Sequence, residues 1–216
     1  MTQGVLPVKY EEEKKDFGST ALGGTLLFLD LLSKMGFRRI VRDNLRAKED
    51  KQGWSDLQVL LCLLLLNICG GDCVDDVKLM EKDDGLMRLL KHLEIGNSFG
   101  RRRKKLERQW RQWRNGKKNV VPSPSSIFRY LLLFHNVSQE GLRVPNKAFI
   151  PAPNKYLLGL IKINQAMLEF LQLNNVQKIA TLDMDATLVE SSKDKAFYCY
   201  KKFKGYQPFN VWCCVV

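Results

Sequence analysis

The sequence predicts an α+β fold, in which a helical region over residues 21–150 precedes antiparallel strands within residues 151–216. Apolar residues recur at helical spacing through the first region, and aromatic and β-branched residues dominate short segments near the end. Residues 1–20 are polar and acidic, and we expect them to be flexible. A chain of 216 residues has room for one large domain or two small ones.

The first helices are marked by leucine-rich stretches. Leu22–Met35 predicts a short apolar helix that ends at Gly36, and Phe37–Arg46 predicts a basic helix after it. Trp54–Cys69 gives the strongest helix prediction, with Ser55 or Asp56 as its N-cap. Because it is apolar on nearly every face, we expect this helix to be buried at the centre of the helical region.

Two shorter helices follow, over Val74–Lys82 and Leu86–Leu93, with a break at Asp84-Gly85 between them. Short helices joined by tight turns are compatible with a helix-turn-helix motif and equally with a plain helical bundle. The spacing of the apolar residues does not separate these two alternatives.

Positive charge is concentrated in one segment. The formal net charge is +12, and residues 101–118 alone hold ten Lys or Arg and one Glu. Such charge indicates a polyanionic partner, with nucleic acid the first candidate and an acidic membrane surface the second. If the segment is helical, Trp110 and Trp113 pack inward while the cations contact phosphates, and binding is sensitive to salt. The predicted DNA contacts here are Arg101, Arg102, Arg103, Lys104, Lys105, Arg108, Arg111, Arg114, Lys117 and Lys118.

Pro122–Asn136 begins with a helix start signal, in which Ser123 is the N-cap and Pro124 takes the first helical position. An apolar face then recurs at helical spacing. Ser125, Ser126 and Arg129 remain outside that face near the positive end of the helix, so we add them to the predicted DNA contacts. A recognition helix has this pattern, and so has any surface helix.

A proline-containing loop, Gly141–Pro153, predicts a domain boundary, and an amphipathic helix follows over Tyr156–Leu173. Strands are then predicted over Lys178–Val189, Ala196–Lys201 and Gln207–Val216, with Lys204-Gly205 as a turn. Since short links join consecutive strands, the pattern indicates an antiparallel meander.

Two carboxylates lie in the first of these strands. Asp183 and Asp185 share one face, because side chains alternate along a strand. A metal ion, a cationic partner or a solvated sheet face would each account for them. The local sequence Asp183-Met184-Asp185-Ala186-Thr187 resembles the opening motif of haloacid dehalogenase-like phosphatases. That resemblance implies a nucleophilic Asp183, an acid/base Asp185 and magnesium, but it covers only this motif.

A second resemblance covers most of the chain. Five ordered blocks are similar to those of one group of DDE-type transposases of bacterial insertion sequences: WSDLQVLLCLLLLNICGGDCVDD, VPSPSSIFRYLLLFHN, VPNKAFIPAPN, ATLDMDATLVES and YCYKKFKGYQPFNVW. It implies an RNase H-like catalytic domain, here truncated after its first antiparallel strands, which follows a helical DNA-binding region.

The transposase resemblance also implies chemistry. Asp185 matches the first catalytic acid and metal ligand, with Asp183 as a supporting metal ligand for Mg2+. The implied reaction is DNA strand cleavage and transfer at element ends. The family's second Asp and its Glu have no counterpart in this sequence, so we expect the chain alone to be inactive. A non-catalytic DNA-binding regulator derived from a transposase is the alternative, and a phosphatase is the third.

The expected partner is DNA carrying the element's terminal repeats, and assembly into a homo-oligomer is compatible with this interpretation. No signal peptide is recognisable, and the longest apolar run, Val59–Leu66, is too short to span a bilayer. We therefore expect a cytoplasmic, nucleoid-associated protein without membrane contact, whose cysteines are reduced thiols rather than zinc ligands.

Overall fold

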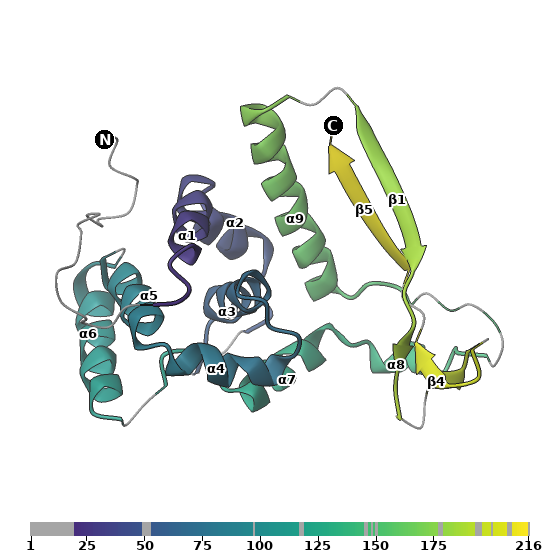
Figure 1. Ribbon diagram of the computed structural model, residues 1–216, viewed down its shortest axis with the longest axis horizontal. Coiled ribbons are helices and arrows are strands. Elements are labelled where there is room, and N and C mark those ends of the chain that lie inside the picture. Colours follow the sequence, from purple (N-terminus) through teal and green to yellow (C-terminus); the bar gives the residue numbers. More distant parts are fainter. Residues whose placement is uncertain are drawn as a thin grey trace. The chain divides into compact units, whose positions relative to one another are not determined.

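The computed structural model describes residues 20–48, 53–96, 98–116, 119–144, 147, 149, 151–176, 179–192, 196–199, 201–206 and 209–215. For residues 113, 114, 140, 180–186 and 209–215 only the backbone is described. The fold is α+β, with helices followed by antiparallel strands (Figure 1). Two compact units divide the chain, and each is described by itself. Unit 1 comprises residues 1–135 and 154–167, and unit 2 comprises residues 136–153 and 168–216.

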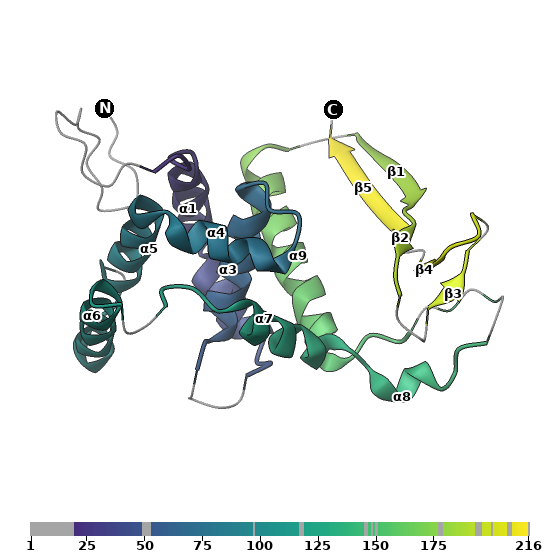
Figure 2. The same cartoon turned by 60° about the horizontal axis from the view of Figure 1, so that its bottom comes forward.

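Unit 1 is helical, and its central helix α3 is surrounded by the other helices of the unit (Figure 2). Its elements are α1 (Thr25–Lys34), α2 (Phe37–Asn44), α3 (Asp56–Ile68), the 3-10 turn η1 (Val74–Asp76), α4 (Val77–Lys82), α5 (Asp84–Gly96), α6 (Gly100–Arg114), α7 (Pro124–Leu131), the 3-10 turn η2 (Leu132–Phe134) and the first part of α9 (Lys155–Asn174). None of the described helices is both long enough and apolar enough to cross a membrane.

The predicted helix starts are confirmed at α3 and α7. Ser55 caps α3 through a reciprocal pair of hydrogen bonds: its Oγ accepts from the Gln58 backbone N–H, and its own N–H donates to Gln58 Oε1. Ser123 caps α7, whose first helical residue is Pro124. At the junction of α1 and α2, Gly36 adopts a φ of 70°, which a residue with a Cβ rarely does.

The predicted break between the two helices is confirmed, but it lies at Asp83 rather than at Asp84-Gly85, since α4 ends at Lys82 and α5 begins at Asp84. The physical reason is a cap one residue earlier. The Asp83 carboxylate accepts a hydrogen bond of 2.8 Å from the Leu86 N–H, which satisfies a free donor in the first turn. Gly85 is therefore accommodated inside the helix despite its low intrinsic propensity.

The core of unit 1 lies between α3, α5 and α7. Leu65, Leu86, Met87, Ile127 and Tyr130 are each at most 2% exposed. The Tyr130 hydroxyl donates to Asp56 Oδ1 at 2.8 Å, which joins α7 to the start of α3. Burial is the main cause that raises the pKa of Tyr130, and the hydrogen bond to Asp56 raises it further. The phenol therefore remains protonated.

Helix α9 approaches the end of α2 closely. A Cβ placed on Gly159 would lie 2.6 Å from the Asn44 carbonyl oxygen and 3.1 Å from Leu45 Cδ1. Backbone cannot yield as a side chain can, so this contact requires glycine.

Unit 2 holds α8 (Val137–Glu140), the later part of α9, and the strands β1 (Ala180–Ala186), β2 (Val189–Glu190), β3 (Phe197–Tyr198), β4 (Lys204–Tyr206) and β5 (Phe209–Val215). β1 pairs antiparallel with β5, and the small antiparallel sheet has the order β2-β4-β3. The side chain of Arg143 lies over the rings of Phe197 and Tyr206, with its Cζ 5.1 and 5.4 Å from the ring centroids.

The strands are antiparallel as predicted, but the meander order is wrong. The two seven-residue strands, β1 and β5, pair directly with each other, although the short strands β2, β3 and β4 lie between them in the sequence. Lys204-Gly205, predicted as a turn, lies in β4. A Cβ on Gly205 would come 2.5 Å from the Val189 carbonyl oxygen, so this glycine permits close strand approach rather than a chain reversal.

Candidate nucleic-acid interface

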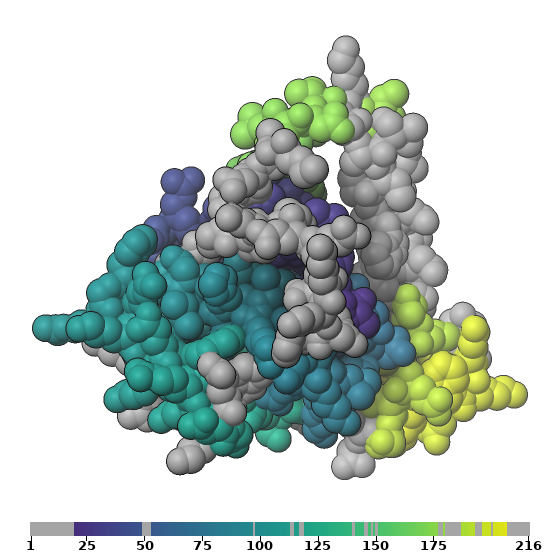
Figure 3. All heavy atoms as spheres, turned by 60° about the vertical axis from the view of Figure 1, so that its left-hand side comes forward, coloured from purple at the N-terminus to yellow at the C-terminus, as the bar shows by residue number. Residues whose placement is uncertain are grey.

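The predicted basic helix is α6, and most of its cations lie on one side of it. At 100° per residue, five cations fall on the side opposite Leu106, whose side chain is 5% exposed. All five are exposed, and Figure 3 looks onto the side of unit 1 where α6 lies. We call them the basic stripe: Arg101, Lys104, Lys105, Arg108 and Arg111.

The charge distribution along α6 is unfavourable for the helix itself. Its first turns carry Arg101, Arg102, Arg103, Lys104 and Lys105, and its first turn has no acidic residue. The helix dipole favours anions at this end, and like charges four residues apart repel each other. Folding stability therefore does not explain the arrangement, whereas a bound polyanion would offset the repulsion.

Within the described residues, α6 contains a single ion pair, between Arg103 Nε and Glu107 Oε1 at 2.9 Å. Both side chains are exposed, so the pair contributes little to stability. It does occupy Arg103, which lies on a different side of the helix from the basic stripe. Glu107 also lies one helical turn from Lys104 and Arg111 of the stripe, but its ion pair is with Arg103, so a single carboxylate faces the eight cations of α6.

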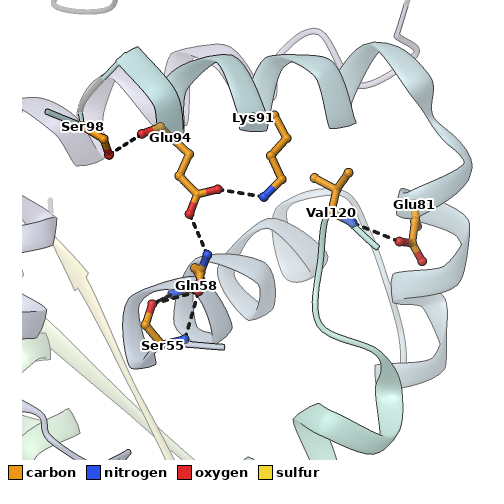
Figure 4. Close-up of polar contacts among 7 residues, drawn as sticks. All are labelled: Ser55, Gln58, Glu81, Lys91, Glu94, Ser98 and Val120. Carbon is orange, nitrogen blue, oxygen red and sulfur yellow. Dashed lines mark hydrogen bonds and ion pairs between the residues drawn. The ribbon is translucent and has the colours of Figure 1, made fainter. Parts of the chain in front are cut away.

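A polar network attaches α5, the packing partner of α6, to α3 (Figure 4). Glu94 Oε2 pairs with Lys91 Nζ at 2.8 Å, and Glu94 Oε1 accepts from Gln58 Nε2 at 2.6 Å. Ser98 Oγ donates to the Glu94 carbonyl at 2.8 Å, just before α6 begins. Since Lys91 is 3% exposed, its charge is compensated inside the unit and is not available to a partner.

Helix α2 supplies cations that the predicted contacts did not include. Phe37 and Val41 bury one face of α2, while Arg39 and Arg42 are exposed and Arg38 is half-buried. Burial lowers the pKa of Arg38, and the nearby positive charge of Arg102 on α6 lowers it further. The basic surface thus extends from α6 to α2. The arginine-rich sequence FRRIVRDN of α2 was the sequence signal that could have predicted these additional cations.

The predicted contacts on α7 lie apart from α6. In both ribbon views α6 is at one end of unit 1 and α7 is below its centre (Figures 1 and 2). Ser125 and Arg129 are exposed, and Arg129 Nε donates to the Ser125 carbonyl at 3.3 Å. Ser126 Oγ lies 3.0 Å from Ser123 Oγ and so belongs to the helix cap. Ser126 is half-buried and engaged in the cap, so its hydroxyl is less accessible to DNA than that of Ser125.

Three of the predicted cations are not placed. Lys117 and Lys118 lie outside the described residues, and of Arg114 the structure describes the backbone alone, in the last turn of α6. The helix prediction for residues 101–118 is confirmed as far as Arg114.

Asp183 and Asp185 occupy alternate positions of β1, opposite Trp212 and Asn210 of β5. Directly paired positions of an antiparallel ribbon share a face, so the positions of Asp183, Asp185 and Asn210 lie on one face. Their side chains are outside the described part of the structure. Carboxylate and amide oxygens are suitable ligands for a hard cation such as Mg2+. Elsewhere in the described residues, no group of three His, Cys, Asp or Glu side chains has metal-binding geometry.

Comparison with known proteins gives no assignment, since no family model, curated protein or solved structure matches the chain.

Proposed function

We propose that this chain binds DNA through the basic stripe of α6 and acts in DNA transposition as part of a DDE-type transposase. The observation that carries the DNA-binding proposal is the set of cations at the unfavourable, positive end of a helix whose first turn has no acidic residue. The transposase proposal is supported by the five ordered sequence blocks and by two carboxylates on alternate positions of β1.

In this proposal Asp185 is the first catalytic acid, and Asp183 supports it in holding Mg2+. The metal would supply charge stabilisation at the cleaved phosphodiester. The residues fit a hard cation in donor type, since Asp183, Asp185 and Asn210 offer only oxygens and amide nitrogen. Two magnesium ions need more carboxylates than this strand provides. We therefore expect DNA binding, but no strand cleavage, from the chain alone.

DNA binding is tested with the full chain and a fluorescently labelled duplex, by anisotropy over a range of salt concentrations. We expect affinity to fall steeply as salt rises, because bound cations release counterions from the phosphates. A flat salt response would refute binding through the stripe.

Metal binding is tested separately, by electron paramagnetic resonance of Mn2+ titrated into the chain. We expect binding that is weakened in Asp185→Asn and retained in Glu190→Gln, a nearby exposed carboxylate on β2. Equal binding by both variants would remove Asp185 from the metal site while leaving DNA binding untouched.

A DNA-binding regulator derived from a transposase is the second candidate. It predicts salt-sensitive DNA binding without the Asp185-dependent metal signal. The phosphatase alternative is disfavoured by the antiparallel pairing of β1, because the phosphatase motif is followed by parallel strands. Magnesium-dependent hydrolysis of an aryl phosphate, lost in Asp183→Asn, would restore that alternative.

A further inference from the structure

Unit 1 contains a cavity of about 440 Å³ between α1, α2, α3, α5 and the start of α6. This volume is within the range of small-molecule sites. Most of its wall is apolar, and α3 supplies the central part of it. The apolar lining includes Leu32, Phe37, Trp54, Leu61, Leu65 and Val121.

The charged groups of this cavity are unbalanced. Five cationic side chains line it, and Glu94 is the single acidic one among the described residues. Glu94 pairs with Lys91 and accepts from Gln58. Its negative charge also offsets part of the positive charge of Arg38, so one carboxylate faces all five cations. The arginines are Arg38, Arg39, Arg42 and Arg102.

Arg38 and Arg102 are the unusual pair, since they approach the cavity from different helices. Within the described residues neither has a carboxylate at ion-pair distance. Arg38 is half-buried, so water only partly replaces a partner. Burial and the positive charge of Arg102 both disfavour the charged form of Arg38, and Glu94 offsets this only in part. A further anion bound between the two guanidinium groups would stabilise both charges.

We propose that this cavity binds a small amphipathic anion, a carboxylate with an apolar chain. The carboxylate lies between the guanidinium groups of Arg38 and Arg102, which offer geometry suited to bidentate hydrogen bonds. The apolar chain lies against Leu61 and Leu65 of α3. The cavity thus offers positive charge for the carboxylate and apolar side chains for the apolar chain, and all of its lining residues belong to unit 1.

The experiment compares octanoate with octan-1-ol, which has the same chain length but no charge. Each is titrated into the full chain by calorimetry, and the indole N–H signal of Trp54, which lines the cavity, is followed by NMR. We expect octanoate to bind about tenfold or more tightly than the alcohol, as charge-assisted hydrogen bonds would give. Inorganic phosphate, an anion without an apolar body, should bind more weakly than octanoate.

Variants separate the two halves of the site. The double variant Arg38→Gln/Arg102→Gln should reduce octanoate affinity to that of the alcohol. Leu61→Phe, which places a ring in the cavity, should weaken both ligands. Arg88→Gln is the matched control, because Arg88 is exposed on α5 and does not line the cavity. Circular dichroism verifies that each variant is folded.

Three results would overturn the proposal: equal affinity for octanoate and octan-1-ol, octanoate binding that survives the double arginine variant, or no shift of the Trp54 signal. Tighter binding of phosphate than of octanoate would also overturn it, because it would indicate a site that binds inorganic anions without an apolar chain. None of these readouts depends on DNA binding, so failure of this proposal would not refute the proposed function, and failure of the proposed function would not refute this proposal.

Discussion

Replacing the five cations of the basic stripe by glutamine should strongly weaken DNA binding and make its salt dependence much shallower. Each phosphate that a cation neutralises contributes about −0.9 to the slope of log affinity against log salt concentration. If all five cations contact phosphates, the slope becomes shallower by about 4.5. Between about 50 and 200 mM salt, that slope corresponds to a change in affinity on the order of several hundredfold.

For the same variant we also predict the effect on the free energy of unfolding. Because cations at the start of α6 oppose the helix dipole and repel each other, their removal should leave the free energy of unfolding unchanged or slightly higher. Loss of binding with retained or increased stability distinguishes a binding surface from a structural one. Thermal unfolding followed by circular dichroism measures this.

A charge-matched control decides whether position matters. Five exposed cations from other helices of unit 1 are replaced by glutamine, which gives the same change in net charge: Lys34, Lys78, Lys82, Arg88 and Lys162. The slope of this control should remain close to that of the unaltered chain. If the stripe variant and the control lose the same slope, binding reflects net charge alone and the assignment to α6 is refuted.

Three further predictions concern the scaffold of unit 1. Glu94→Gln leaves Lys91 buried without a counter-charge and should cost about 3 kcal/mol in urea unfolding, whereas Lys91→Met/Glu94→Gln should cost clearly less; an equal cost would exclude a role of the ion pair. Burial raises the pKa of Cys62 from 9.0 to about 12, so the thiol's contribution to stability is fully present below pH 9 and is lost as pH rises toward 12. Near pH 10 the loss is about 1 kcal/mol, and Cys62→Ala should show a correspondingly flatter decline; parallel declines would contradict this. Gly159→Ala should destabilise by about 1–3 kcal/mol because its Cβ meets the backbone of the α2 end, while Gly24→Ala, which meets nothing within 4 Å, serves as the control; equal stabilities would show that the contact relaxes.

The helices of unit 1 were predictable from sequence because their signals are local. Ser55, Ser123 and Gly36 act within a few residues, and the leucine spacing of α3 is repeated over several turns. Asp83 shows where such reasoning fails. Its side chain caps the Leu86 N–H, so α5 begins before Gly85, a residue that in sequence suggests a break between helices.

The strand order was less predictable, since pairing depends on contacts between residues far apart in the chain. Nothing local indicates that Asp185 faces Asn210 rather than a residue of the next strand. Likewise, the sequence alone suggests that Gly205 belongs to a turn. Only the structure shows that the carbonyl of Val189 lies beside it and leaves no room for a Cβ.

The candidate site was predicted in part. The composition of residues 101–118 was sufficient to find α6, because charge density is visible in sequence. The approach of Arg38 to Arg102 was not, since it requires α2 and α6 to pack near each other. The cavity between the helices has no sequence signature at all, because its lining comes from five helices and the segments that connect them.

Arg102 belongs both to the basic helix and to the wall of the cavity. An anion bound beside it would cancel positive charge within a Debye length of the basic stripe. Thermodynamic reciprocity then requires that DNA and the small anion weaken each other's binding by the same factor. A small carboxylate would in this way act as an antagonist of DNA binding without contacting the basic stripe, and its potency would decline as salt screens the charges.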